Sequence, residues 1–521
     1  MHRKNKSKIF KIFKISLCFV GLILLASFIR IKIAKWESRF VTLSSDGSLV
    51  YHPDSLGNIL PDFSRVGYRE GGIPIPKIKV VKTIYPAASG SSQKIIQAAI
   101  DEVSRLKPDK QGFRGAILLK KGTYNVEGTV FIKTGGIVLR GEGEGKGTGK
   151  GGTRIIATGT KQRSLIEVMG SGRIQKIKGT EATISDPFVP LGAKSFNLSS
   201  TKGFSVGDSV IIFRPGTVRW IHDLKMDQIV ARKGTKQWSP DYYNLEYERV
   251  ITDIKGNRLF LDNPVVMQME TKYGGGAIYG YHFNGRINKV GIENLYLESA
   301  YTNDTAENHG WVAIRMDKVE NCWVNHVTSR YFGYSCVSLG YGARNTTVMN
   351  ASCLDAKSII TGSRRYSFNN DGQLNLFMNC HATEGRHDYV TGAKVCGPNV
   401  FYNSTAERTH ADIGPHHRWA TGTLYDNIQT TGQIDIQDRG NWGSGHGWSG
   451  VNQILWNCKG ASVVVQDPWV SGHNYCIGLI GNKGKPRFKD RNEGIWEGLN
   501  RKGLQPTSLY MAQLEQRLNK R

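Results

Sequence analysis

The chain has 521 residues, of which 39% are hydrophobic and 21% charged, so it can bury a large core and wholesale disorder is excluded. Gly accounts for 61 positions, which favours tight turns and short strands over long helices. The 69 Lys and Arg against 43 Asp and Glu give a net charge of +26. Such a balance indicates a partner that is a polyanion.

The excess of positive charge belongs to the body of the chain as well as to its start. Nine cations lie in residues 1–36, and without them the net charge is still +17. We find no zinc-finger spacing, no phosphate-binding loop and no basic recognition helix, so nucleic acid is not the expected partner. An acidic polysaccharide is the polyanion that the sequence favours.

Residues 1–36 have the pattern of an export signal. Lys and Arg crowd positions 3–14, and an uncharged apolar stretch of fifteen residues follows at 15–29. This stretch is short for a bilayer span and suits the core of a signal peptide, but the cleavage site is weak. A cleaved signal peptide and an uncleaved membrane anchor both remain open, and either one places the body outside the cytoplasm, secreted or periplasmic.

The eight cysteines do not form a disulfide framework. Cys18 lies in the apolar segment, the other seven follow residue 320, and none forms a CxxC pair. We expect them to be small buried hydrophobic residues.

The first half of the body divides into three segments. Residues 37–90 read as a linker and N-terminal arm, and residues 91–179 as a cap helix followed by the first β-coils. The apolar spacing of 93–106 predicts the helix. Residues 180–272 alternate like antiparallel strands and are expected to be an inserted β-subdomain. Its aromatic stretch around Trp238 is expected either to overhang the main body and stack on sugar rings or to pack beneath the insertion.

A five-residue unit recurs in the second half of the body. The copies NCWVN, NLFMN, NVFYN, TLYDN and QILWN begin at 321, 375, 399, 423 and 453, and a weaker copy of six residues, NTTVMN, begins at 345. The period of 24 residues, with occasional insertions of 6, fits one solenoid turn per copy, and no long helix fits between copies. The fold class is therefore predicted to be all-β, a right-handed parallel β-helix over residues 273–485, followed by a C-terminal helical tail at 486–521. The Asn residues that end the copies are expected to form an internal ladder: Asn325, Asn379, Asn403, Asn427 and Asn457.

The repeat arithmetic brings polar residues from distant positions onto one wall. Adjacent coils stack about 4.8 Å apart, so residues 24 positions apart become neighbours. Five residues are candidates for catalysis: His410, His387, Arg386, Asp388 and Asp412. The candidates for substrate binding are Arg364, Arg365, Tyr366, His416, His417, Arg418, Trp419, Asp435, Asp438, Arg439 and Trp238.

One segment resembles a known superfamily. The motifs QAAID, ILLKKGTY, GTVFI, VLRGEG and GGTRI between Ser92 and Ile155 are similar to the N-terminal coils of the pectate-lyase-like superfamily of right-handed parallel β-helix carbohydrate-active proteins. The resemblance implies the fold and a carbohydrate substrate, and it leaves the reaction open, because the superfamily includes lyases, hydrolases, epimerases and phage tailspikes. Neither the three-carboxylate signature of polygalacturonases nor the calcium and arginine pattern of classical pectate lyases is present, so no catalytic residue is transferred.

Two chemistries fit the wall. In β-elimination on a uronate polymer, Arg386 with Arg418 or Arg365 would bind the substrate carboxylate, and His410, oriented by Asp412, would be the base. His387 or Tyr389 would then be the acid. The alternative is glycoside hydrolysis by carboxylates on adjacent coils: Asp388, Asp412 and Asp435.

The density of His and Arg and the basic body favour a polysaccharide lyase. A non-catalytic carbohydrate-binding or structural β-helix is the third reading. His387, His410 and Asp412 could ligate zinc, but no spacing is diagnostic, so no metal site is predicted. The sequence implies no cofactor and leaves a calcium (Ca) requirement open. We expect a monomer whose partner is an acidic polysaccharide, with a membrane contact only through the N-terminal segment.

Overall fold

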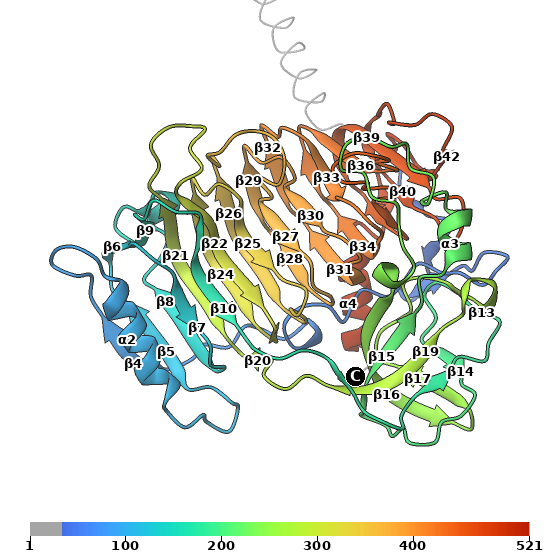
Figure 1. Cartoon of the computed structure of the whole chain (residues 1–521), viewed down its shortest axis with the longest axis horizontal. Coiled ribbons are helices and arrows are strands. Elements are labelled where there is room, and N and C mark those ends of the chain that lie inside the picture. The colour runs from blue at the N-terminus through green and yellow to red at the C-terminus, as the bar shows by residue number, and fades with distance from the viewer. Residues whose placement is uncertain (1–33, 520–521) are drawn as a thin grey trace, which may run out of the picture. The chain divides into compact units, whose positions relative to one another are not determined.

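A computed structural model describes residues 34–519, and the compact unit that begins at Glu37 is built mainly from short parallel strands (Figure 1). Each strand pairs with its counterpart one coil later, so that Val324 lies beside Val348, Val348 beside Phe377, and Phe377 beside Phe401. Position by position, these pairs follow the repeat found in the sequence. The parallel β-helix predicted from that repeat is confirmed.

Each coil contributes strands to three faces. The first face comprises β4 (Val80–Ile84), β5 (Gly115–Leu119), β8 (Ile137–Gly141), β21 (Gly291–Ser299), β24 (Trp323–Arg330), β26 (Thr347–Leu354), β28 (Leu376–Met378), β31 (Cys396–Tyr402), β34 (Ala420–Asp426), β38 (Ile454–Trp456), β40 (Tyr475–Ile477) and β43 (Ile495–Glu497). The second comprises β6 (Gly122–Val126), β9 (Thr153–Ala157), the later halves of β21, β24 and β26, then β29 (His381–Thr383), β32 (Thr405–Glu407), β35 (Gln429–Thr430), β39 (Lys459–Asp467) and β41 (Ile480–Lys483). The third comprises β7 (Val130–Ile132), β10 (Arg163–Met169), β22 (Gly310–Asp317), β25 (Ser335–Leu339), β27 (Phe368–Asn370), β30 (Tyr389–Thr391), β33 (Asp412–Pro415) and β36 (Gln433–Ile436), beside the later part of β39.

The core runs along the inside of the coils as stacks of like side chains. Phe377 stacks on Phe401 with ring centroids 4.9 Å apart, and Phe401 stacks on Tyr425 at 5.4 Å. All seven cysteines of the described residues are free and buried, as expected of small hydrophobic residues. The core is therefore a continuous apolar column. Stacking of successive coils removes the inner face of each coil from water.

Helices protect the solenoid at one end and along one side. The helix α2 (Gln93–Ser104) buries Ile96, Ile100 and Val103 in the core beside the first coils. The helix α4 (Leu509–Asn519) packs near β34, where the buried carboxylate of Asp426 accepts hydrogen bonds from Ser508 Oγ and from the backbone N–H of Tyr510, each 2.8 Å long. The strand β43 still pairs with β40, so coils continue into the region that the sequence assigned to the helical tail.

Asparagines form two ladders, and the ladder predicted from the sequence lies at an exposed corner rather than inside. Asn403 Nδ2 donates to Asn379 Oδ1 at 2.7 Å, and Asn457 Nδ2 donates to Asn427 Oδ1 at 3.0 Å. Most of these residues adopt the left-handed conformation, which Asn tolerates better than most residues. The buried ladder is made by the first Asn of the repeat unit, where the N–H of Asn375 donates to Asn399 Oδ1 at 2.9 Å.

An antiparallel subdomain interrupts the coils between β10 and β21. Its strands are β11 (Gln175–Lys176), β12 (Ala182–Thr183), β13 (Phe188–Val189), β14 (Ser195–Asn197), β15 (Ser209–Arg214), β16 (Leu245–Lys255), β17 (Arg258–Leu261), β18 (Met269–Glu270) and β19 (Ala277–His282), with the short helix α3 (Val218–Asp223). In Figure 1 it lies beside the later coils. It includes a few residues on each side of the range 180–272 that the sequence indicated.

The aromatic stretch of the subdomain is packed rather than overhanging. The Trp238 ring is only 5% exposed, stacks on Tyr243 with centroids 4.0 Å apart, and meets Trp419 of the β-helix at 6.3 Å. Trp238 and the fully buried Trp419 therefore cannot stack on a substrate sugar, because other aromatic rings already occupy their faces.

The export segment predicted at 1–36 lies almost wholly outside the described residues. Over residues 34–519, no helix has the length and the apolar character that a membrane crossing requires.

Candidate active site

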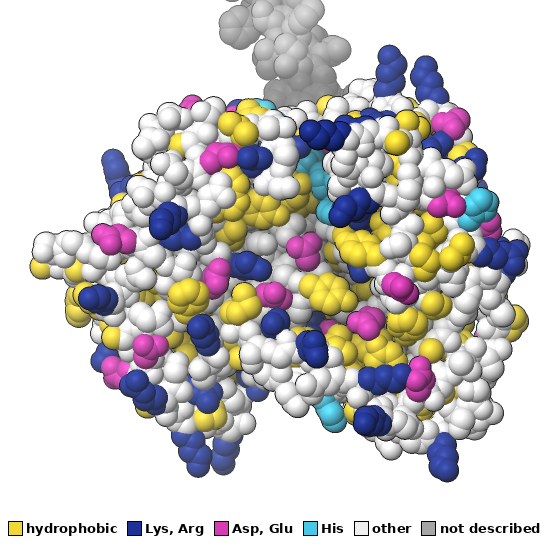
Figure 2. Space-filling view, viewed as in Figure 1, with side chains coloured by type: hydrophobic (Ala, Val, Ile, Leu, Met, Phe, Trp, Pro, Cys, Tyr) yellow, Lys and Arg dark blue, Asp and Glu magenta, His cyan; other side chains and the backbone are white. Residues whose placement is uncertain are grey.

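The candidate site lies on the outside of the third face, where β30, β33 and β36 run side by side. Figure 2 shows histidine side chains in a hollow of the surface, with Lys and Arg around them. The residues of this cluster come from the turn before β30, the end of β33 and the loop that follows β36. Parallel stacking thus assembles a site from segments about 60 residues apart.

His387 is the best-defined member of the cluster. Its Nδ1 lies 2.8 Å from the backbone oxygen of Asp412, which can only accept, so Nδ1 carries the proton. Its Nε2 therefore bears a lone pair, and no protein group bonds to it. Burial lowers the pKa of His387 to about 4, although the nearby Asp412 carboxylate opposes the shift. At neutral pH this imidazole is an unprotonated base.

Three further imidazoles surround His387. The ring of His416 lies 4.4 Å from that of His387, and the ring of His446 lies 5.1 Å from His416 and 4.8 Å from His417. Burial lowers the pKa of all three, and the charge of Arg439 lowers it further. The charge of Arg418 adds to this effect at His417 and at His446, where the pKa falls to about 3. The Nδ1 of each is buried without a hydrogen-bond partner. The cluster is rich in neutral bases inside a positive field.

Two carboxyl groups stand beside the imidazoles. Asp412 on β33 forms a buried ion pair with Arg439, whose Nε remains unpartnered. Asp435 on the next coil accepts a hydrogen bond from Gln437 Nε2 at 3.0 Å. Burial, together with the charge of Asp412, raises the pKa of Asp435 to about 7. The two carboxyls therefore differ in environment although they lie on adjacent strands.

The shifted pKa of Asp435 predicts a pH-dependent stability. Between about pH 4 and pH 7 the unfolded chain releases this proton while the folded chain keeps it, so the free energy of unfolding falls as the pH rises through this window. The change Asp435→Asn should remove that loss. Denaturant unfolding at about pH 4 and about pH 7.5 gives the free energy of unfolding of both proteins. The difference between the variant and the unchanged protein should be more favourable to the variant at the higher pH. The exposed Asp101→Asn serves as control, and an equal gain at both pH values would contradict the shift.

Tyr366 closes one side of the cluster. Its ring stacks on that of Tyr334 with centroids 5.0 Å apart and lies perpendicular to the ring of His387 with centroids 4.9 Å apart. Burial raises the pKa of Tyr366 to about 12, so the phenol keeps its proton at neutral pH and can donate it.

The predicted pairing of His410 with Asp412 is wrong. His410 Nε2 lies 2.7 Å from Glu384 Oε2 at the corner between the second and third faces, and Glu384 also accepts from Arg408 Nε at 2.9 Å. Asp412 is occupied by Arg439 and lies by His387 instead. His410 is thus held outside the imidazole cluster, and Glu384, which the sequence analysis missed, is its partner.

Several other predicted residues brace turns. Arg364 makes a two-pronged ion pair with Glu307, Arg365 bonds to Ser358, and Arg386 bonds to the backbone of Gly362. Asp438 pairs with Arg491 at 2.8 Å and is fully buried. The contacts of Arg365 and Arg386 occupy groups that the elimination hypothesis had assigned to the substrate carboxylate. Those of Arg364 and Asp438 occupy two further candidates for substrate binding.

Two residues of the predicted wall are buried inside the coils. Asp388 is completely buried and accepts from Ser367 Oγ at 2.6 Å, and burial raises its pKa to about 7. The hydroxyl of Tyr389 donates to backbone oxygens of Cys380 and Thr405 in the interior. Neither side chain faces the hollow, so Asp388 is no partner for Asp412 and Tyr389 is no acid.

His446 is the main residue that sequence reasoning missed. It lies in the loop 438–448, outside every repeat copy, but the glycines around it in GSGHGW are a usable signal. Gly443 has a φ of 55°, and a Cβ there would lie 2.0 Å from the His446 ring. Only glycine lets the loop fold back so closely on this ring.

The subdomain holds this loop in place. Arg232 Nη2 donates to the oxygen of Gly443 at 2.9 Å, the N–H of Lys236 donates to the oxygen of Ser444 at 3.1 Å, and Asn441 Nδ2 donates to the oxygen of Val230 at 3.0 Å. Arg418 Nη2 also donates to Ser444 Oγ at 2.6 Å. The subdomain thus supports the site instead of supplying stacking residues to it.

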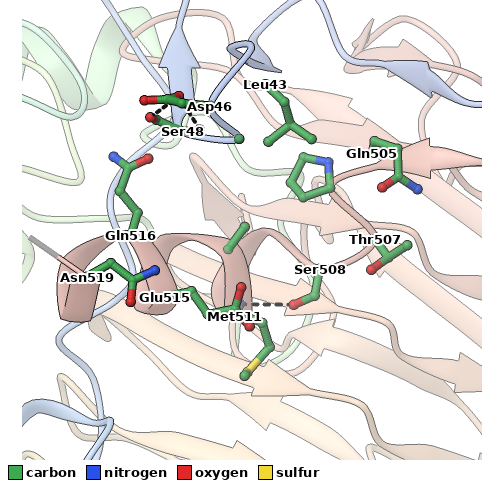
Figure 3. A pocket seen from close by; sticks show the side chains of 13 residues that line it. Leu43, Asp46, Ser48, Gln505, Thr507, Ser508, Met511, Glu515, Gln516 and Asn519 are labelled. Carbon is green, nitrogen blue, oxygen red and sulfur yellow. Dashed lines mark hydrogen bonds between the residues drawn. The ribbon is translucent and has the colours of Figure 1, made fainter.

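A separate hollow of about 540 Å³ lies between the N-terminal arm and α4 (Figure 3). Asp46 and Ser48 face Gln516 and Asn519 across it, and Glu515 lies on the helix. Its lining contains no Lys, Arg or His, and two of its members are acidic. This hollow is unsuited to an acidic polymer.

No group of three or more His, Cys, Asp or Glu within residues 34–519 has the arrangement of a metal site.

Comparisons with known proteins give only distant likenesses. No family model matches the chain, and no curated protein matches it, so the superfamily resemblance stays a prediction. Among solved structures, the tailspike gp49 of Pseudomonas phage LKA1 has 12% identity and a TM-score of 0.36, covering 78% of this chain and 74% of its own. An alginate lyase from Paenibacillus sp. has 9% identity and a TM-score of 0.38, with coverage of 81% and 100%.

An iota-carrageenase of A. fortis has 8% identity and a TM-score of 0.33, and the chain covers 59% of that protein while 78% of this chain is matched. At TM-scores this low the likenesses carry no argument about reaction or substrate. The case for function therefore rests on the side chains of the site.

Proposed function

We propose that the protein is a polysaccharide lyase that cleaves an acidic, uronate-containing polysaccharide by β-elimination outside the cytoplasm. The observation that carries the proposal is the buried Nε2 of His387, whose lone pair has no protein partner and which lies among neutral imidazoles and near Arg439. The composition of residues 1–36 supports an extracytoplasmic location.

Elimination needs a cation for the substrate carboxylate, a base and an acid. In this proposal Arg439, which is held by Asp412 and has a buried, unpartnered Nε, binds the carboxylate and stabilises the negative charge that develops on it. His387 Nε2 takes the proton from the carbon next to the carboxylate. The electrons of that C–H bond form a carbon–carbon double bond as the bond to the glycosidic oxygen breaks. Tyr366, whose ring is perpendicular to that of His387 at 4.9 Å, donates a proton to the departing oxygen.

The products test the reaction directly. The purified protein is incubated with a panel of acidic polysaccharides, including polygalacturonate and alginate. An ultraviolet-absorbing unsaturated uronate that appears together with new chain ends supports elimination. New reducing ends without that absorption would contradict it.

The carboxyl pair on adjacent coils favours a second candidate, glycoside hydrolysis. Asp435, with its raised pKa of about 7, would be the proton donor, and Asp412 the carboxylate partner. In this case Asp435→Asn would abolish formation of reducing ends. In the elimination mechanism Asp435→Asn should leave most of the activity, because no proton passes through it.

A further inference from the structure

A positively charged rim borders the hollow on the side of the loop 438–448. It is formed by Arg232 and Lys236 of the subdomain and by Arg487, which lies just after β41. Within residues 34–519 these three side chains form no ion pair with a carboxylate, whereas many other arginines of the body do. At one edge of the site these three charges therefore have no direct ion-pair partner, although the charge of Asp438 acts on Arg487.

An exposed aromatic ring lies against this rim. Trp442 is 38% exposed, and the Arg487 guanidinium packs over its ring at 4.5 Å, with Arg439 at 5.8 Å. Arg487 also packs over Phe488 at 5.1 Å. Arg487 covers part of the indole, and the exposed remainder of the ring lies next to a fixed positive charge. This arrangement is suited to a sugar ring that carries an anionic group.

Arg487 is held in this position by contacts that lead back to the candidate catalytic centre. Its Nη2 donates to Asn441 Oδ1 at 2.7 Å, and its N–H donates to Gln437 Oε1 at 2.8 Å. Gln437 in turn bonds to Asp435. Trp442 and His446 share one loop, in which the N–H of His446 donates to the oxygen of Trp442 at 3.0 Å. The ring and the imidazoles therefore keep a fixed relation.

We infer that Trp442 and Arg487, with Arg232 and Lys236 around them, form a subsite for an anionic sugar residue of the same polymer, next to the sugar that undergoes reaction. The inference rests on the proposed function for the identity of the polymer. Trp442 provides the stacking face, and Arg487 binds the anionic group, a carboxylate or a sulfate ester. The subsite selects chains that carry charge on consecutive sugars.

The test measures binding and turnover separately. Trp442→Ala and Arg487→Gln are compared with two exposed controls at the opposite end of the solenoid, Tyr85→Ala and Arg105→Gln. Calorimetric titration uses polygalacturonate, its carboxyl-reduced form and dextran sulfate as probes. Turnover and KM are measured on the best polymer of the panel, and melting temperatures confirm that each variant is folded.

We expect each site variant to weaken binding of a charged probe about tenfold and to raise KM with little change in kcat, because the subsite lies beside the reacting bond. The controls should bind as the unchanged protein does. Loss confined to polygalacturonate identifies a carboxylate subsite, and loss confined to dextran sulfate identifies a sulfate subsite. The carboxyl-reduced polymer should bind weakly to every variant.

The failures of the two proposals are distinguishable. Cleavage with unchanged KM and binding in both site variants would overturn the subsite and leave the lyase standing. If both site variants bind the charged probes more weakly but no polymer is cleaved, the subsite is supported and the lyase is refuted. Absence of binding of every charged probe to the unchanged protein would overturn the subsite.

Discussion

Replacing His387 with alanine should lower turnover on the best acidic polysaccharide by roughly 10²–10⁴, the usual contribution of a positioned general base. The reason is that the hydrogen bond from His387 Nδ1 to the backbone oxygen of Asp412 fixes the tautomer of the ring. Its Nε2 therefore carries the lone pair that can accept the proton. Release of unsaturated product, followed by ultraviolet absorption at several substrate concentrations, gives kcat and KM for each variant. The fall should appear in kcat.

His410→Ala is the matched control for this prediction. It removes an imidazole only a few residues from the site, but one held by Glu384 at the corner of the coils. Its turnover should stay close to that of the unchanged protein. If His410→Ala lost most of its turnover while His387→Ala lost little, the base would be His410. That result would refute the assignment made from the structure.

Replacing Glu248 with glutamine should lower the free energy of unfolding by about 3–5 kcal/mol, as expected when one partner of a buried ionic cluster loses its charge. Glu248 is buried on β16 and accepts from Arg286 at 2.6 and 2.7 Å and from Arg344 at 3.0 Å. Although burial alone would raise it, the pKa of Glu248 falls to about 2 because of these two arginines. The variant leaves Arg286 buried without its counter-charge and leaves Arg344 with only Glu320, 3.4 Å away.

Denaturant unfolding measures the effect, and Glu181→Gln provides its control. Glu181 pairs with Lys176 at the surface, where both side chains are more than 40% exposed. Exposed pairs contribute about 0–1 kcal/mol, so this variant should unfold almost as the unchanged protein does. Equal losses in the two variants would show that the buried cluster contributes no more than a surface pair.

The architecture could be predicted because it follows from a period. A residue in one copy of the unit reappears one coil later, and the stacked pairs Val348 with Phe377 and Phe377 with Phe401 follow directly from that spacing. The ladder of Asn379 and Asn403 follows in the same way. The period does not show which Asn of the unit points outward. The last Asn lies at the exposed corner, and the buried ladder is made by the first, as at Asn375 and Asn399.

The site was predicted only in part because turns decide where side chains point. His387 and Asp412 were placed correctly on neighbouring coils. Arg408, with a φ of 49°, reverses the chain before His410, which turns that imidazole toward Glu384 and away from Asp412. Backbone reversals of this kind have no signature in the spacing of residues.

His446 was missed for a different reason. Its loop follows no repeat, and its position depends on hydrogen bonds to Val230 and Lys236, which are more than 200 positions earlier in the chain. Such contacts between remote segments appear only when the chain is folded.

The attachment of the subdomain limits how this solenoid can vary. Inserted before the fourth coil, the subdomain reaches Arg344 through Glu248, Gly397 through Arg249, and far later Ser471 through Glu270. Solenoids ordinarily gain or lose whole repeats freely, because each coil touches only its neighbours. Here one added coil between these anchor points would shift the later ones by about 4.8 Å and break their hydrogen bonds. The contacts of the subdomain with Arg344 and Ser471 therefore fix the number of coils between these two residues.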